Sequence, residues 1–317
     1  MPLTRSDIST LLTPGLRTLF FEALAERKVD AYLQIATVIQ SDKDQETYPW
    51  LGQSPAVREW IDERVPKSLA EQKYTIINKK WENSIEVDRT AIEDDQYGQI
   101  KIRVQQLAEK FGQHMNKACF NLLRDGGANG GGLCYDGQYF FDSDHSDEGS
   151  ASQSNSGTAG GAIGTVALTA LSLWEAIAAM QSLTDPQGEY LDIAPDTLVV
   201  PPKLEKTARE ILESDYGYSA TAMGSASTWV GNTLKGRLKL IVTPHCATTG
   251  RTSSWFVLDT SGVVKPIILQ MRTPVEFQSL ESDSANGFYR DCYAYGGRAR
   301  YAGGYGVWQK AYGSFVA

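Results

Sequence analysis

Hydrophobic residues recur with helical spacing in one long segment near the middle of the chain. Apolar side chains return every three or four positions, as the buried face of an α-helix requires. They are Ile100, Val104, Leu107, Ala108, Phe111, Met115, Ala118, Cys119 and Leu122. Residues 93–95 are acidic and suit the start of a helix, while Arg124 and the glycines after it suit the end. A helix over about residues 95–124 would run roughly 45 Å, which indicates a structural strut.

The first 45 residues have too few apolar positions to form a hydrophobic core of their own. Thr13-Pro14 resembles a helix start, an N-cap followed by proline at the first helical position. The apolar residues that follow on one face are Leu16, Leu19, Phe20 and Ala23. Residues 31–40 are expected to form an extended apolar run. We therefore expect an arm that lies along another part of the molecule.

Residues 46–90 change from helical to alternating periodicity. Tyr74 and Ile76, then Ile85 and Val87, recur at a spacing of two with polar residues between them. This alternation predicts β-strands with little core of their own. A projecting hairpin, which needs a partner surface, is the natural interpretation.

The second half of the chain has an α/β pattern that ends in a strand-rich third. Residues 126–164 are rich in glycine and serine, and 149–164 predict a mobile or extended loop. Thr169 is expected to cap a helix to about Ser182, with Trp174, Ile177, Ala178 and Leu183 inward. A turn at 185–188 and a helix at 203–212 are expected, with strands at 197–200, 238–242, 255–258, 267–269, 275–277 and 289–305. The expected fold class is α+β.

Composition narrows the function classes. No stretch approaches the roughly 20 apolar residues that cross a bilayer, and the N-terminus has no signal-peptide core, so we expect an intracellular chain. A net charge of −8 disfavours a protein whose main task is to grip nucleic acid. The four cysteines have no CxxC spacing and are expected to be packed free thiols.

The acidic segment 142–148 is the best metal candidate. An EF-hand loop needs glycine at its sixth position and glutamate at its twelfth. Counting from Asp142, these positions hold Asp147 and Gln153, so the motif fails. We expect a solvated acidic turn, with an unrelated cation site as the alternative.

Other candidate chemistry is weaker. The glycine run 126–132 follows a helix and lacks a phosphate-loop lysine, so it predicts a helix-terminating loop. His245-Cys246 would point to opposite faces of a strand, which favours packing over catalysis. Arg298 and Arg300 could touch nucleic acid, but a structural or subunit-interface role is favoured. The remaining histidines are His114 in the long helix and His145 in the acidic turn. We therefore expect no catalytic, cofactor or metal residues, and an assembly protein.

Four stretches of the sequence resemble a known family. They are IEVDRTAIEDDQ (85–96), YFFDSDH (139–145), LVVPPKLE (198–205) and RARYAGGYGVWQ (298–309). The chain resembles the Mu-like major head subunit family, called gpT, and more broadly the HK97-type capsid proteins of tailed phages.

The resemblance implies a layout and a function. It implies an arm at 1–45, an extended β-loop at 46–88, a peripheral domain at 89–164 with the spine helix, an axial domain at 165–254, and strands at 255–317 that return to the peripheral domain. It implies hexamers and pentamers in an icosahedral shell around double-stranded DNA, assembled in the bacterial cytoplasm. A portal and separate scaffolding and protease proteins are expected, because no scaffolding segment precedes the arm.

Some points stay open. Some relatives crosslink subunits through lysine and asparagine, but the spacing of Lys67, Lys73, Lys79 and Lys80 does not establish that chemistry here. Another virion component, such as a tail tube, is the alternative structural interpretation. A cytosolic hydrolase that uses His245 or the acidic turn is the alternative of another class.

Overall fold

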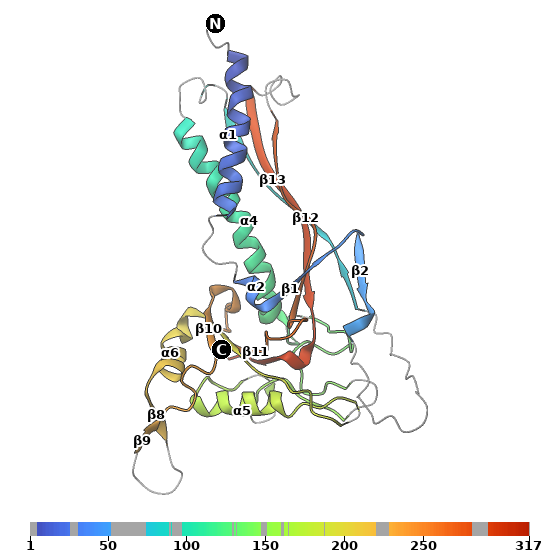
Figure 1. Cartoon of the computed structure of the whole chain (residues 1–317), viewed down its shortest axis with the longest axis vertical. Coiled ribbons are helices and arrows are strands. Elements are labelled where there is room, and N and C mark those ends of the chain that lie inside the picture. The colour runs from blue at the N-terminus through green and yellow to red at the C-terminus, as the bar shows by residue number, and fades with distance from the viewer. Residues whose placement is uncertain are drawn as a thin grey trace.

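The computed structural model describes residues 5–25, 31–51, 74–88, 90, 97–128, 130, 132–146, 151–159, 162–163, 165–186, 188–219, 228–280 and 291–316. The molecule is elongated (Figure 1). Two helices and a long β-hairpin form a tower, defined by α1, α4, β4, β12 and β13. The tower rises from a wider base that contains α5, α6 and a second sheet. The N-terminal helix lies at the far end of the tower, and the C-terminus lies in the base.

The strut of the tower is α4 (Tyr97–Asp125), a helix of 29 residues. The predicted stripe is buried: Ile100, Val104, Leu107, Ala108, Phe111, Met115 and Cys119 are each less than a tenth exposed, and Ala118 and Leu122 pack against the core. The strut prediction is therefore confirmed. The acidic residues 93–95 that were expected to cap it lie outside the described residues.

The N-terminal helix α1 (Arg5–Ala25) begins earlier than predicted, with Pro14 inside it rather than at its start. An internal proline loses one hydrogen bond and costs about 3 kcal/mol. Leu16 and Phe20 are fully buried where α1 packs along α4, and this contact offsets the cost. The apolar run at 31–40 was predicted as extended throughout, but its first half is α2 (Tyr32–Ile35).

The first sheet has the strand order β1-β12-β13-β4. Its strands are β1 (Ala36–Gln40), β12 (Ile267–Leu280), β13 (Cys292–Tyr305) and β4 (Lys79–Asp88). β1 runs parallel to β12, and the other pairs are antiparallel. The two strands expected at 267–269 and 275–277 are one strand, whose register shifts between Met271 and Glu276. Pro274 lies in this irregular stretch, where a missing N–H is tolerated.

The second sheet, in the base, has the order β10-β7-β11-β14. Its strands are β7 (Thr197–Val200), β10 (Lys239–Val242), β11 (Trp255–Leu258) and β14 (Ala311–Ser314). Every residue of β7, β11 and β14 is buried, as the near-continuous apolar runs of β7 and β11 predict for those two strands. The strands after residue 254 are thus divided between the sheets: β11 and β14 lie in the base, and β12 and β13 in the tower.

The helices of the base are α5 (Ala170–Gln181) and α6 (Glu205–Glu213). Thr169 caps α5 through a capping box with Ser172, as the sequence predicts. The predicted inward face is partly wrong, because Ala178 is exposed. The residues of α5 that are buried are Ser172, Leu173, Ala176, Ile177 and Met180.

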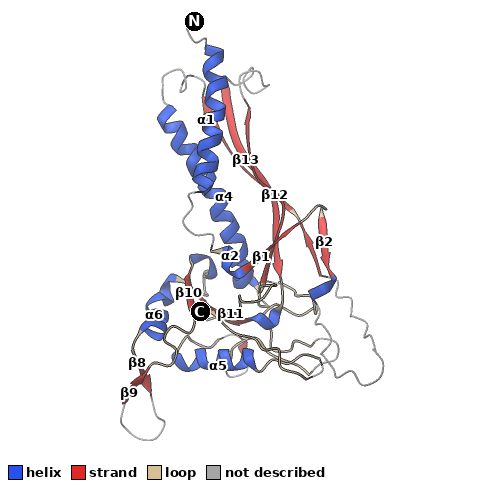
Figure 2. Cartoon of the chain, in the orientation of Figure 1, coloured by secondary structure: helices blue, strands red, loops and turns tan. Residues whose placement is uncertain are grey.

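Short elements connect these parts (Figure 2). Three two-stranded sheets pair β2 (Gln45–Tyr48) with β3 (Tyr74–Ile77), β5 (Thr158–Ala159) with β6 (Ala162–Ile163), and β8 (Tyr216–Ser219) with β9 (Thr228–Gly231). The 3-10 helices are η1 (Pro49–Leu51), η2 (Pro202–Leu204), η3 (Pro244–Cys246) and η4 (Trp308–Lys310). Within the segment predicted to form a hairpin, β3 pairs with β2, whereas β4 pairs with β13 in the tower sheet. None of the described helices is long and apolar enough to span a bilayer.

Candidate functional site

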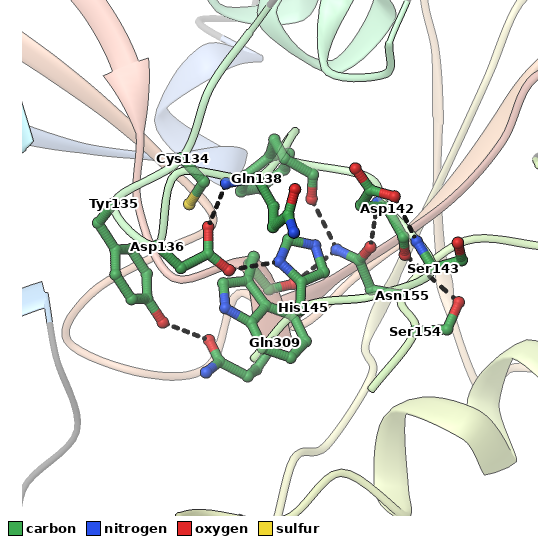
Figure 3. Close-up of polar contacts among 12 residues, drawn as sticks. Cys134, Tyr135, Asp136, Gln138, Asp142, Ser143, His145, Ser154, Asn155 and Gln309 are labelled. Atoms are coloured by element: carbon green, nitrogen blue, oxygen red, sulfur yellow. Dashed lines mark hydrogen bonds and ion pairs between the residues drawn. The ribbon is translucent and has the colours of Figure 1, made fainter. Parts of the chain in front are cut away.

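A buried polar cluster joins the loop after α4 to the C-terminal segment of the chain (Figure 3). At its centre, Nδ1 of His145 lies 2.6 Å from Oδ2 of Asp136, and the two side chains are 0% and 1% exposed. The indole of Trp308 stacks on the His145 ring, with 4.0 Å between ring centroids and 6° between the planes. A buried ionisable group is costly unless it is hydrogen-bonded. The contact between Nδ1 of His145 and Oδ2 of Asp136 gives each of these atoms a hydrogen-bond partner, and it thereby holds the loop in place.

Asn155 extends the cluster by bonding three segments at once. Its Nδ2 donates to the carbonyl oxygens of Phe140, at 2.7 Å, and Trp308, at 3.2 Å. Its Oδ1 accepts from the backbone N–H of Asp142 at 2.9 Å. A fully buried amide with these partners orders loops that have little regular secondary structure of their own.

The predicted solvated acidic turn is therefore wrong for Asp142 and His145, which are both buried. Among the described residues of this segment, Asp144 and Ser146 are exposed and fit the prediction, and Asp147 and Glu148 lie outside the described residues. A hydrogen bond with Asp142, together with the negative charge of that residue, raises the pKa of the Asp144 carboxyl. The signal for burial is absent from the local pattern, because Trp308 is far away in the sequence.

No described residues form a metal centre: in the ranges given above, no group of three or more histidine, cysteine or acidic side chains is placed to hold an ion. The glycine run follows α4, and the N–H of Gly130 donates to the carbonyl of Gly127 at 2.9 Å. This turn confirms the predicted helix-terminating loop for its described part.

The other two histidines are His114, on the strut helix α4, and His245, in η3. Nδ1 of His114 is 2.6 Å from the hydroxyl of Tyr301 on β13. His245 lies in η3 and not on a strand, so the prediction of opposite strand faces is wrong; Pro244 at the first position favours a short helical turn. Burial and the nearby charge of Lys117 lower the pKa of both imidazoles.

The four cysteines are free thiols, as predicted, and three of them are buried. Cys119, Cys134 and Cys246 are buried free cysteines, and Cys292 is half-buried. Burial raises the pKa of Cys119 to about 12 and also raises that of Cys246. A thiol without a thiolate form is a poor nucleophile, so His245 and Cys246 do not make a catalytic pair.

Of the two arginines singled out on β13, Arg300 forms an ion pair within the subunit and Arg298 is exposed. Nη2 of Arg300 lies 2.8 Å from Oδ1 of Asp44, an ion pair that ties β13 to the turn before β2. Arg298 is exposed and pairs in strand register with Glu82. Among the lysines considered for crosslinking, Lys79 and Lys80 are exposed on β4, and Lys67 and Lys73 lie outside the described residues.

The comparison with protein families decides the classification. The family of the Mu-like prophage major head subunit gpT matches residues 10–166, 162–246 and 247–316. The chain belongs to this family. The resemblance carried by the four sequence stretches is thus confirmed, and this gpT-family chain is a major capsid protein, a structural subunit of the virion shell and not an enzyme.

Relatives agree with the membership. The chain is 27% identical over 307 residues to the Mu-like prophage FluMu major head subunit of Haemophilus influenzae, covering 96% of this chain and 72% of that protein. It is 32% identical over 145 residues to the major capsid protein of Escherichia phage Mu, covering 46% of each. A chain from the procapsid of bacteriophage JBD30 is 30% identical and covers 99% of this chain and 76% of its own length, with a TM-score of 0.56. The α+β fold is that of the HK97-type capsid proteins.

Proposed function

We propose that this gpT-family subunit assembles with copies of itself into hexamers and pentamers of an icosahedral shell that encloses double-stranded DNA. The observation that carries the proposal is the likeness to the procapsid subunit of bacteriophage JBD30 along nearly the whole chain. The elongated tower supports it, because a long strut beside a twisted sheet gives a subunit a large lateral surface.

Exposed apolar side chains also support assembly. Val263 is 94% exposed, Ile77 58% and Ile102 56%. Single exposed apolar side chains are common on isolated proteins, so these three mark candidate contact points and do not form one patch. They lie before β12, at the end of β3 and on α4, so contacts at these points would involve both the tower and the β2–β3 pair.

The proposed layout starts from the implied division into an arm at 1–45, an extended loop at 46–88, a peripheral domain at 89–164, an axial domain at 165–254 and returning strands at 255–317, and it changes this division in two places. The pairing of β4 with β13 supports a narrower projection, because residues 79–88 are fixed in the tower sheet. The pairing of β11 and β14 with β7 supports assigning these two strands to the axial part.

The proposed mechanism is conformational. The precursor shell would form with a separate scaffolding protein and a portal, and the spine helix, loop and arm would rearrange when the shell expands. Burial of further apolar surface between subunits would then stabilise the expanded state.

Negative-stain electron microscopy of the purified chain, with and without its scaffolding protein, tests the proposal. We expect closed shells of uniform diameter when the scaffold is present. Tubes or single rings would instead indicate a tail component. Dispersed particles of about 35 kDa under both conditions would overturn the capsid proposal.

A further inference from the structure

A groove runs between α4 and the edge strand β4. It consists of two adjoining hollows of about 190 and 360 Å³ that share Trp81, His114 and Lys117 in their walls. Lys79 lines the smaller hollow, and Lys110 lines the larger one. The groove is therefore bounded by α4, by the strand β4 that precedes it, and by Tyr301 of the distant strand β13.

Two lysines, with His114 between them, form a row along this groove. Lys110, His114 and Lys117 are spaced by four and then three residues on α4, which places them on one face over roughly 10 Å. Lys79 adds a charge from the β4 side, and His245 adds a titratable ring from η3. A row of this length matches a polymer with repeated charges better than a single ion.

The lysines are not neutralised within the described part of the chain. No described carboxylate forms an ion pair with Lys79, Lys110 or Lys117, and Glu82 is the single acidic residue that lines either hollow. Lys110 makes a 3.3 Å hydrogen bond to Gln113, which is neutral. In a chain of net charge −8, this groove is a local concentration of positive charge.

The aromatic wall of the groove is already ordered. Nε1 of Trp81 donates to the carbonyl of Tyr301 at 3.0 Å, and its ring lies 4.2 Å from that of His114. His114 is held in turn by the Tyr301 hydroxyl. These rings pack against one another in tilted arrangements, so they build the wall and leave the lysines to contact a ligand.

We propose that this groove binds consecutive phosphates of a double-stranded DNA backbone, an inference that rests on the proposed role of the chain in enclosing DNA. Lysine ammonium groups are point charges that bind phosphate without reading base edges, so the contact is independent of sequence. The affinity of one groove is low, and repetition of the groove over a closed shell makes it effective.

Binding of a fluorescent 20-base-pair duplex to the purified full-length chain, measured by anisotropy, tests the inference. Three phosphate contacts predict that log K falls with log salt concentration with a slope of about −2.7, so affinity drops roughly 40-fold between 50 and 200 mM salt. The variant Lys79→Gln/Lys110→Gln/Lys117→Gln is expected to lose at least about tenfold in affinity and most of this slope.

The matched control is Lys206→Gln/Lys235→Gln/Lys239→Gln, which removes the same charge from exposed positions outside the groove. It is expected to bind like the unmodified chain. Equal binding by the groove and control variants would overturn the inference. If the triple groove variant does not fold, the single exchanges Lys110→Gln and Lys117→Gln, both at exposed helix positions, give the same comparison.

Competitors identify the ligand class. Inorganic phosphate and oligoglutamate, each added at constant ionic strength, should displace the duplex less effectively than unlabelled duplex does. Displacement by inorganic phosphate at equal phosphate concentration would reassign the groove to a free anion, and displacement by oligoglutamate to an acidic protein segment; either result overturns the DNA proposal.

Shell formation separates this inference from the proposed function. Shells that form from the groove variant, with DNA binding equal to the control, would leave the capsid function standing and remove the groove from it. Failure of the unmodified chain to form shells would contradict the capsid function itself, whatever the duplex measurement gives.

Discussion

The imidazole of His145 lies flat on the indole of Trp308, and its Nδ1 meets the carboxylate of Asp136. This contact links the loop after the strut to the turn before β14, two segments that are far apart in the sequence. Because both polar partners are buried, the loop can leave this position only by exposing an aromatic stack and separating a hydrogen-bonded pair. The cluster therefore fixes the base of the strut relative to the C-terminal strands.

Removing the imidazole should destabilise the subunit strongly. His145→Ala leaves Oδ2 of Asp136 buried without its hydrogen-bond partner, which costs about 1–3 kcal/mol, and also removes the stack on Trp308. Urea unfolding of the subunit, followed by circular dichroism, measures the change. Ser146→Ala, at an exposed position one residue away, is the control and should change the free energy of unfolding by less than about 0.5 kcal/mol. Similar effects of the two exchanges would contradict the structural role of the stack.

The close contact between β13 and α4 should depend on Gly297. A Cβ at this position would overlap the ring of Phe111, which is buried and also packs on Phe20. Gly297→Ala should therefore cost about 1–3 kcal/mol through overpacking. Gly98→Ala is the matched exchange on α4, because nothing lies within 4 Å of its Cβ, and it should be neutral or stabilising by up to about 1 kcal/mol. Thermal unfolding of both variants gives the comparison, and an unchanged melting temperature for Gly297→Ala would refute it.

Thiol reactivity should distinguish Cys292 from the other cysteines. Cys119, Cys134 and Cys246 are buried, whereas Cys292 is half-buried. Burial raises the pKa of the Cys119 thiol to about 12, so almost none of it is thiolate at neutral pH. Titration of the folded subunit with Ellman's reagent should show one fast thiol, and Cys292→Ser should remove it. After denaturation, all of the thiols should react. Fast modification of a second thiol in the folded subunit would argue against this packing.

Subunit stability should fall on mild acidification because of His114 and His245. Burial and the charge of Lys117 lower the pKa of both rings below the ordinary value of 6.5. At a pH between the lowered and the ordinary pKa, the unfolded chain binds more protons at these two rings than the folded subunit does. The free energy of unfolding therefore decreases as the pH falls below about 6.5. Above about 7.5 both rings are neutral in both states and contribute no further change. Melting temperatures from pH 8 to pH 5 measure the effect, and His245→Gln should flatten the curve. A stability that rises on acidification would contradict the sign.

Local patterns were sufficient where the physical cause is local. The strut α4 could be predicted because its apolar stripe has helical periodicity over several turns, and the helix after Thr169 because the capping box is a short-range motif. The buried strands β7 and β11 follow from short apolar runs. The start of α1 was misplaced because a proline inside a helix is tolerated only when packing, here of Leu16 and Phe20 on α4, offsets its cost. Likewise, the apolar runs at 267–269 and 275–277 could not show that the chain continues through Pro274 as a single strand.

The candidate sites were harder to predict because their parts come from distant segments. Asp142 and His145 look like a solvated turn in sequence, and only the fold brings Trp308 and Asn155 to cover them. The fold brings Lys79 close to Lys110 and Lys117 along the groove. The net negative charge of the whole sequence gives no sign of this local positive charge. By itself, the sequence determined the helices α4, α5 and α6, most strands, the absence of a familiar catalytic motif and the family resemblance, since each depends on short-range spacing or on residue identity. The tertiary structure alone decided which polar groups are buried and which charges converge, because burial and electrostatic contact depend on distances through space.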